Sequence, residues 1–179
     1  MEQKKNNIIL VGFMGTGKSV VGKKLSRVLK RELVDTDSLI EKKAGKSIPK
    51  IFSEDGEEHF RGLESEVAKE VSKKKNCVII AGGGIVLREE NIRVLKTNGI
   101  LICLEASPEV IYERVKNDTY RPLLQVKDPL QKIRDLLEYR KKYYDRADYF
   151  IDTSELIIDE VVDEIMKYEM SKSKVQNPK

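Results

Sequence analysis

A short apolar run that leads directly into a glycine-rich loop constrains this chain more than any other feature. Residues 8–11 (IILV) are aliphatic and mostly β-branched, and residues 12–19 (GFMGTGKS) fit the pattern G-x-x-x-x-G-K-[ST]. Apolar residues then recur at helical spacing over residues 18–30. A strand, a glycine-rich loop and a helix N-terminus in this order predict an α/β fold with a site for nucleotide phosphates.

The residue types within the loop suit phosphate binding. Glycines adopt positive φ angles and let backbone N–H groups approach phosphate oxygens. Lys18 can carry a positive charge to the β- and γ-phosphates, and the hydroxyl of Ser19 is a hard oxygen ligand for Mg²⁺. A turn that only joins a strand to a helix is the alternative, but such a turn has no need of Lys-Ser after its last glycine.

The composition is that of a soluble globular protein. Of the 179 residues, 40% are hydrophobic and 36% are charged, and no apolar run approaches the ~20 residues of a membrane span. We therefore expect a cytoplasmic protein without membrane contacts. The net charge of +4 suits small polyanions and does not require nucleic acid. Cys77 and Cys103, both in apolar runs, are expected to be buried free thiols, and His59 to be a surface or helix residue.

Strand and helix patterns alternate along the whole chain. Five short apolar segments are the strand candidates: 7–12, 32–34, 77–81, 99–104 and 149–151. Six further segments have helical patterns: 18–30, 57–72, 89–97, 108–116, 130–146 and 155–170. Near-continuous apolar strands that alternate with helices predict a parallel sheet covered on both faces, which is a three-layer α/β/α domain.

Two segments interrupt this alternation within a single domain that we expect to span residues 1–170. The first, about 36–63, combines short helical pieces with proline and glycine, and is expected to form a lobe that holds the substrate. The second, about 114–129, is rich in turn residues and is expected to be a mobile lid. The polar end of the chain, 171–179, is expected to be frayed.

Two carboxylates follow the second strand candidate at positions i and i+2. Asp35 and Asp37 lie where the carboxyl ends of parallel strands face a ligand crevice, and an extended backbone would project both to one side. Asp35 could hold a water of Mg²⁺, and Asp37 could bind and polarise a substrate hydroxyl. Alternatively, Asp37 could cap the helix that starts at Ser38.

An arginine and a carboxylate three residues apart, followed later by three consecutive glycines, form a second group of candidates. Arg61 could bind a substrate carboxylate through two parallel hydrogen bonds, or it could form an ordinary surface ion pair with Glu64. Gly82, Gly83 and Gly84 end an apolar strand, where so much glycine usually lets a ligand touch the backbone. A flexible turn is the alternative for these glycines.

Three further arginines are candidates for contacts with the nucleotide or the substrate. Arg121, within the turn-rich segment, is expected to reach the phosphates when a lid closes and to neutralise charge that develops in phosphoryl transfer. Arg114 could stack on a purine ring. Arg140 lies in a charged helical segment, where simple exposure to solvent is the alternative.

Together these motifs resemble the shikimate kinase family over residues 8–153, most of the chain. The matching stretches are GFMGTGKS at 12–19, DTD at 35–37, IFSEDGEEHFRGLE at 51–64, GGG at 82–84, RPLL at 121–124 and the segment 140–144. The phosphate loop alone identifies only a nucleotide-binding superfamily, whereas the combination of FR-x-x-E, GGG and RPLL is far more specific. The resemblance implies a P-loop NTPase fold of the nucleoside-monophosphate-kinase type, with a five-stranded parallel sheet, a substrate lobe and a lid.

The resemblance also implies the roles of individual residues. Shikimate would be held by an aspartate on a ring hydroxyl, by two arginines on the carboxylate and by their neighbours: Asp37, Arg61, Arg140, Gly82, Gly83, Gly84 and Glu64. ATP would be bound by the loop, the first turn of its helix and two arginines: Gly15, Thr16, Gly17, Lys18, Ser19, Val20, Arg114 and Arg121. Mg²⁺ would be held by Ser19, and by Asp35 through a water.

These implications predict a monomeric enzyme that transfers the γ-phosphate of MgATP to the 3-hydroxyl of shikimate in aromatic amino-acid biosynthesis. Lys18, Mg²⁺ and Arg121 would stabilise the transferring phosphoryl group, while Asp37 positions the hydroxyl and could deprotonate it. Two alternatives stay open. One is a related kinase for gluconate or a nucleoside monophosphate, and the other is a non-catalytic ATP-binding module.

Overall fold

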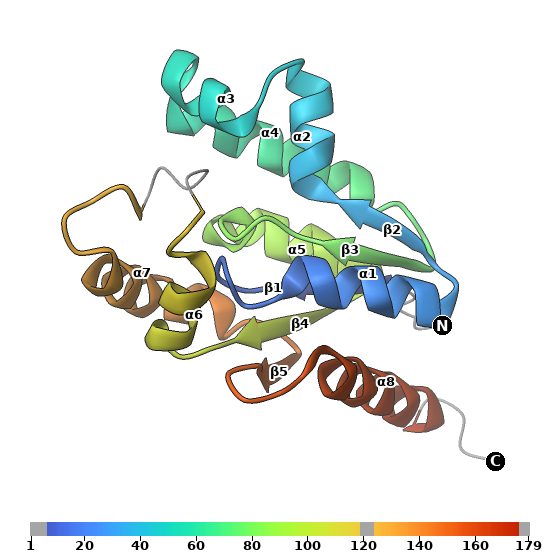
Figure 1. The fold of residues 1–179 in the computed structure, drawn as a ribbon. Helices are drawn as coiled ribbons and strands as arrows, with labels where there is room; N and C mark the ends of the chain where they lie inside the picture. Colours follow the sequence, from blue (N-terminus) through green and yellow to red (C-terminus); the bar gives the residue numbers. More distant parts are fainter. Residues whose placement is uncertain (1–6, 119–123, 176–179) are drawn as a thin grey trace.

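A five-stranded parallel sheet forms the centre of the molecule (Figure 1). The computed structural model describes residues 7–118 and 124–175. The strands are β1 (Asn7–Val11), β2 (Glu32–Asp35), β3 (Cys77–Ile80), β4 (Gly99–Glu105) and β5 (Tyr149–Asp152). They lie side by side in the order β2-β3-β1-β4-β5. The five predicted strands are confirmed, each ending within one residue of its expected end.

Helices cover both faces of the sheet. They are α1 (Lys18–Leu29), α2 (Thr36–Ala44), α3 (Ile48–Glu54), α4 (Gly56–Val71), α5 (Glu89–Asn98), α6 (Pro108–Val115), α7 (Pro129–Tyr144) and α8 (Ile158–Val175), with a 3-10 turn η1 (Ile85–Leu87). Alternate residues of β1 point to opposite faces: Ile8 and Leu10 pack with α1 and α8, whereas Ile9 and Val11 pack with α4 to α7. The three-layer α/β/α prediction is therefore confirmed.

The carboxyl ends of β1, β2 and β3 meet at one edge of the sheet. Leu10 of β1 and Asp35 of β2 both pair with Ile80 of β3, so the loops that leave these strands are neighbours. The phosphate loop, the start of α2 with the DTD segment, and the three glycines follow these three strand ends. Strands β1 and β3 are neighbours, but their onward connections run in opposite directions along the sheet, from β1 through α1 to β2 and from β3 through α5 to β4. Such a switch point is where open α/β sheets bind ligands.

The segment that follows β2 forms three successive helices beside the sheet. Helices α2 and α3 pack on α4 (Figure 1), and each buries one isoleucine completely, Ile40 and Ile51 respectively. Helix α4 begins inside the expected lobe of residues 36–63 and continues to Val71, so that its second half belongs to the layer over the sheet.

The expectation of a frayed end from residue 171 is wrong for residues 171–175. Helix α8 continues through Val175, past the expected end at Met170. Ser and Lys residues in this stretch include no helix breaker, and the first proline comes at Pro178. Residues 176–179 lie outside the described part of the chain.

Three smaller expectations also have an outcome. Cys77 and Cys103 are buried free thiols, as predicted. His59 is exposed on α4. Among the residues that the structure describes, no helix is both long enough and apolar enough to cross a bilayer.

Candidate active site

The phosphate loop between β1 and α1 is held in an open, glycine-dependent conformation. Gly12, Gly15 and Gly17 have φ angles of 138°, 76° and 96°, which residues with a Cβ atom rarely adopt. A Cβ on Gly12 would also overlap the carbonyl oxygen of Leu104. The buried hydroxyl of Thr16 donates to the Phe13 carbonyl at 2.8 Å and closes the loop from inside. The backbone geometry is therefore that of an anion cradle.

Lys18 lies near the end of the phosphate loop, and its side chain reaches back to the start of the loop. Its ammonium group donates to the carbonyl oxygens of Gly12 and Phe13, at 2.8 Å each. Ser19 and Val20 follow in the first turn of α1 and are exposed, with Gly17 at the N-cap. The helix N-terminus thus adds its partial positive charge to that of Lys18.

The capping role after β2 belongs to Asp35. Its Oδ1 accepts from the backbone N–H groups of Asp37 and Ser38, at 2.9 and 3.3 Å, and so caps α2. The alternative that Asp37 caps this helix is wrong, because the cap lies two residues earlier. Asp37 is instead in the first turn of α2, half-buried, with its carboxylate toward the glycine turn.

The glycine turn after β3 is the meeting point of the predicted substrate residues. A Cβ built on Gly82 would lie 2.5 Å from Asp37 Oδ1 and 3.4 Å from Glu64 Oε1. One built on Gly83 would lie 3.8 Å from Arg140 Nη1, and one on Gly84 would overlap the guanidinium of Arg61. A side chain on Gly82 or Gly84 would displace a charged group, whereas a Cβ on Gly83 would make only ordinary contacts. Close approach therefore requires glycine at 82 and 84, which excludes a plain flexible turn at these two positions.

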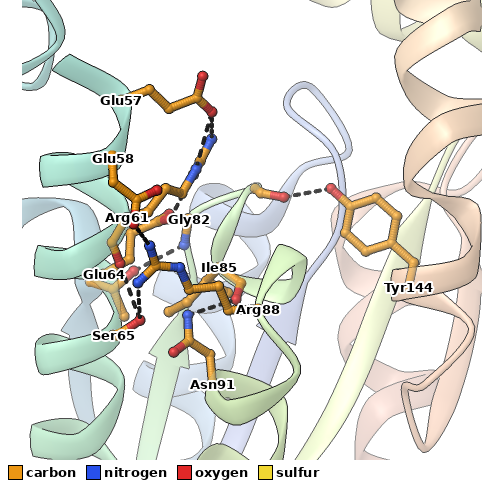
Figure 2. A network of polar contacts seen from close by, with 12 residues as sticks. Glu57, Glu58, Arg61, Glu64, Ser65, Gly82, Ile85, Arg88, Asn91 and Tyr144 are labelled. Atoms are coloured by element: carbon orange, nitrogen blue, oxygen red, sulfur yellow. Dashed lines mark hydrogen bonds and ion pairs between the residues drawn. The ribbon is translucent and has the colours of Figure 1, made fainter.

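Arg61 and Glu64 form a buried pair instead of a surface ion pair. Arg61 Nη1 lies 2.6 Å from Glu64 Oε2, and the exposed fractions of the two side chains are 10% and 2%. Burial raises the pKa of the Glu64 carboxyl, although the charge of Arg61 opposes this shift. A second carboxylate, that of Glu57, also contacts Arg61 (Figure 2).

Arg140 of α7 is buried as well, so exposure to solvent is not its role. It is 5% exposed, and its guanidinium lies 5.4 Å from the ring centroid of Phe13, in the phosphate loop. Among the described residues, its buried Nε has no hydrogen-bond acceptor. A buried donor of this kind is expected where a ligand supplies the acceptor.

Of the two arginines predicted to contact the nucleotide, Arg114 and Arg121, the structure describes only Arg114. Arg114 of α6 donates through Nη1 to the Gly15 carbonyl and to Thr153 Oγ1, each at 3.1 Å, and through Nη2 to the Thr153 carbonyl at 2.8 Å. It therefore ties the phosphate loop to the end of β5, and stacking on a purine stays a prediction. Arg121 lies outside the described residues.

Three supporting residues were not singled out from the sequence as site residues. The Thr36 hydroxyl accepts from the Gly82 N–H at 2.9 Å. The Tyr144 hydroxyl, shown in Figure 2, donates to the Gly83 carbonyl at 2.7 Å. Burial raises the pKa of Tyr144 to about 12, so this hydroxyl stays protonated well above neutral pH. Glu57 is the third. In the sequence, Thr36 lies between two assigned aspartates and Tyr144 lies four residues after Arg140, which is the only signal for either residue. Their contacts with the glycine turn can be seen only in the folded chain.

One cleft of about 340 Å³ joins the phosphate loop to Asp37 and the glycine turn, whereas Arg61 and Arg140 lie beside that turn and do not line the cleft. Loop residues and the first turn of α1 line one part of it, and acidic and glycine residues line the other: Gly15, Gly17, Lys18, Ser19, Val20, Asp35, Asp37, Gly82 and Gly83. Within the described residues, no three His, Cys, Asp or Glu side chains gather as a metal site. The oxygens of Ser19 and Asp35 in this cleft are nevertheless the donor type that suits Mg²⁺.

The fold and this cleft define a P-loop kinase for a small molecule, because the phosphate cradle faces an aspartate and two buried arginines lie beside the neighbouring glycine turn. A family model described as "Shikimate kinase" matches residues 14–169. A shikimate kinase from Thermodesulfovibrio yellowstonii is 49% identical over 161 residues, which are 90% of this chain and 93% of the relative. The chain belongs to the shikimate kinase family.

Solved structures agree with this assignment. A shikimate kinase from Acinetobacter baumannii in complex with shikimate is 40% identical, with a TM-score of 0.89 over 96% of each chain. A shikimate kinase from Aquifex aeolicus is 39% identical, with a TM-score of 0.78 over 93% of this chain and 98% of the other. The predicted family and fold are therefore confirmed.

Proposed function

We propose that the chain transfers the γ-phosphate of ATP to the 3-hydroxyl of shikimate, the step of aromatic amino-acid biosynthesis after which its family is named. One observation carries the proposal: Lys18 and Ser19 of the phosphate loop share a single cleft with Asp37 and the glycine turn. A phosphate donor and an alcohol acceptor can therefore meet in one space. The Acinetobacter baumannii relative in complex with shikimate supports the choice of acceptor.

Shikimate would lie on the glycine turn between the two arginines. Arg61 and Arg140 approach this turn from α4 and α7 and would bind the carboxylate, while Asp37 would accept a hydrogen bond from the reacting hydroxyl. The missing side chains of Gly82 and Gly84 let Asp37 and Arg61 lie against the backbone, where the substrate would contact them. The buried Glu64 holds Arg61 in place from behind.

The phosphate side would need little covalent chemistry from the protein. Lys18 would exchange its loop carbonyls for the β- and γ-phosphates, and the N–H groups of residues 15–20 would cradle them. Ser19, and Asp35 through a water, would hold Mg²⁺, which neutralises phosphate charge when bound. Arg121 would join from the lid. Asp37 would orient the hydroxyl for in-line attack and take up its proton.

We further propose that residues 36–63 act as the substrate lobe, that 114–129 act as the lid, and that the enzyme is a monomer. Helices α2 and α3 pack mainly on α4 and on one another, which supports their movement as a unit. Lid closure would exclude water and limit wasteful hydrolysis of ATP.

The direct test is ADP release from MgATP measured with and without shikimate. We expect release to depend strongly on shikimate, and not on gluconate or a nucleoside monophosphate. Equal release with gluconate or a nucleotide acceptor would favour the related kinases. No release with any acceptor would favour a non-catalytic ATP-binding module.

Asp37→Asn tests the assigned chemistry. The variant keeps the shape of the side chain but cannot take a proton, so turnover should fall about 10²- to 10⁴-fold while ATP still binds. Asp163→Asn, an exposed change on α8, is the matched control and should have wild-type turnover. Near-normal activity of Asp37→Asn would refute the role of this carboxylate.

A further inference from the structure

The guanidinium of Arg61 has two edges that can bind a carboxylate side by side, and a glutamate of α4 contacts each of them. Nη1 donates to Glu64 Oε2 at 2.6 Å. Nη2 and Nε, which form the side edge, donate to the same oxygen of Glu57, at 2.9 and 3.3 Å (Figure 2). A substrate carboxylate that takes the side edge of Arg61 must therefore displace Glu57.

The Glu64 side of Arg61 is fixed by its surroundings. Glu64 is only 2% exposed at its side chain, so its charge cannot leave Arg61 without being stranded in the interior. Gly84 leaves just enough space for the guanidinium, and the ring of Phe60 lies 5.2 Å from it on α4. The guanidinium cannot turn to offer a different edge. The edge that faces Glu57 is the one that a ligand can take.

Glu57 is the replaceable partner. Its side chain is 64% exposed, one helical turn before Arg61, so it can move into solvent at small cost. The charges point the same way. Arg61 and Arg140 balance the buried Glu64 and the cleft-facing Asp37, so Glu57 adds the same extra negative charge that a substrate carboxylate would add.

We propose that Glu57 is an internal competitor for the substrate carboxylate: it occupies the Nε–Nη2 edge of Arg61 in the free enzyme and is displaced when shikimate binds. This inference rests on the proposed function. In the free enzyme, Glu57 pairs with the buried guanidinium of Arg61. Because the substrate carboxylate must displace Glu57, the same contact lowers the affinity for substrate. It is a residue that sets affinity and takes no part in phosphoryl transfer.

The test compares Glu57→Gln with Glu58→Gln. Both changes remove one negative charge from the first turn of α4, but Glu58 pairs with Arg88 and not with Arg61. We expect Glu57→Gln to lower the Kd and the KM for shikimate about two- to fivefold, with kcat and the KM for ATP unchanged. Glu58→Gln should match wild type in all four quantities, and thermal unfolding should show both variants folded.

A second ligand separates carboxylate competition from a general change in the site. The methyl ester of shikimate has no negative charge, so its Kd should be the same for wild type and Glu57→Gln. A Kd for shikimate that is unchanged or raised in Glu57→Gln, or an equal gain for the ester, would overturn the inference alone. Failure of wild-type enzyme to bind shikimate at all would overturn the proposed function together with it.

Discussion

Arg140 is a charged side chain that the fold buries without completing its hydrogen bonds. It is 5% exposed, it lies over the ring of Phe13, and among the described residues its Nε has no acceptor. An unpaired buried donor costs about 1–3 kcal/mol of stability, which a bound carboxylate would return. At the scale of the residue, this cost is evidence that Arg140 is arranged for a ligand.

Arg140→Lys should separate substrate binding from nucleotide binding. Lysine keeps the charge but loses the planar fork that binds a carboxylate through two bonds. We expect the KM for shikimate to rise about tenfold to a hundredfold, since each 1.4 kcal/mol is a factor of ten, with little change in the KM for ATP. Arg134→Lys, on the same helix but in an exposed pair with Glu109, is the control. Equal kinetics of the two variants would remove Arg140 from the substrate site.

At the scale of elements, one threonine joins the phosphate loop to the ends of two strands. Thr153, just after β5, is 3% exposed, and its Oγ1 lies 3.0 Å from the carbonyl oxygens of Thr16 and Glu105. The same oxygen accepts from Arg114, which also holds the Gly15 carbonyl. The position of the cradle thus depends on a contact between segments far apart in the chain.

Thr153→Val should loosen this junction. Valine has the same shape but no hydroxyl, so a loop carbonyl and the Arg114 donor lose a buried partner. We expect the free energy of unfolding to fall by about 1–3 kcal/mol and the KM for ATP to rise several-fold, with a smaller effect on the KM for shikimate. Thr153→Ser restores the hydroxyl and should behave as wild type. If valine and serine gave the same KM for ATP, the contact would have no role in positioning the loop.

Across the whole molecule, the sequence predicted correctly those features that depend on residues close together in the chain. The strands, the phosphate loop and the glycine turn all follow from spacing within a few residues, and the family resemblance supplied Arg61 and Arg140 as a pair. What could not be predicted depends on three-dimensional approach. Which aspartate caps α2 depends on the backbone after β2, and the pairing of Glu57 with the side edge of Arg61 depends on Glu64 holding the other edge.

The buried pair of Arg61 and Glu64 also links the active site to the stability of the whole chain. Burial raises the folded-state pKa of Glu64 above its ordinary value of 4.5, because desolvation outweighs the attraction of Arg61. The folded protein therefore keeps this proton to a higher pH than the unfolded chain does. The stability contributed by Glu64 is fully present below about pH 4.5 and is lost as the pH rises through the folded pKa.

Urea unfolding of wild type and Glu64→Gln from about pH 4, below the ordinary pKa of 4.5, up to about pH 8 tests the linkage. Glutamine does not titrate, so the wild type should lose stability relative to the variant as the pH rises, by about 1.4 kcal/mol for each unit that the pKa is raised. Glu66→Gln, an exposed change on α4, should run parallel to wild type. If the free energy of unfolding of the wild type instead rose relative to that of Glu64→Gln with increasing pH, the attraction of Arg61 would exceed the cost of burial. Glu64 would then be held as a carboxylate by its partner, and the pair would strengthen the fold at neutral pH.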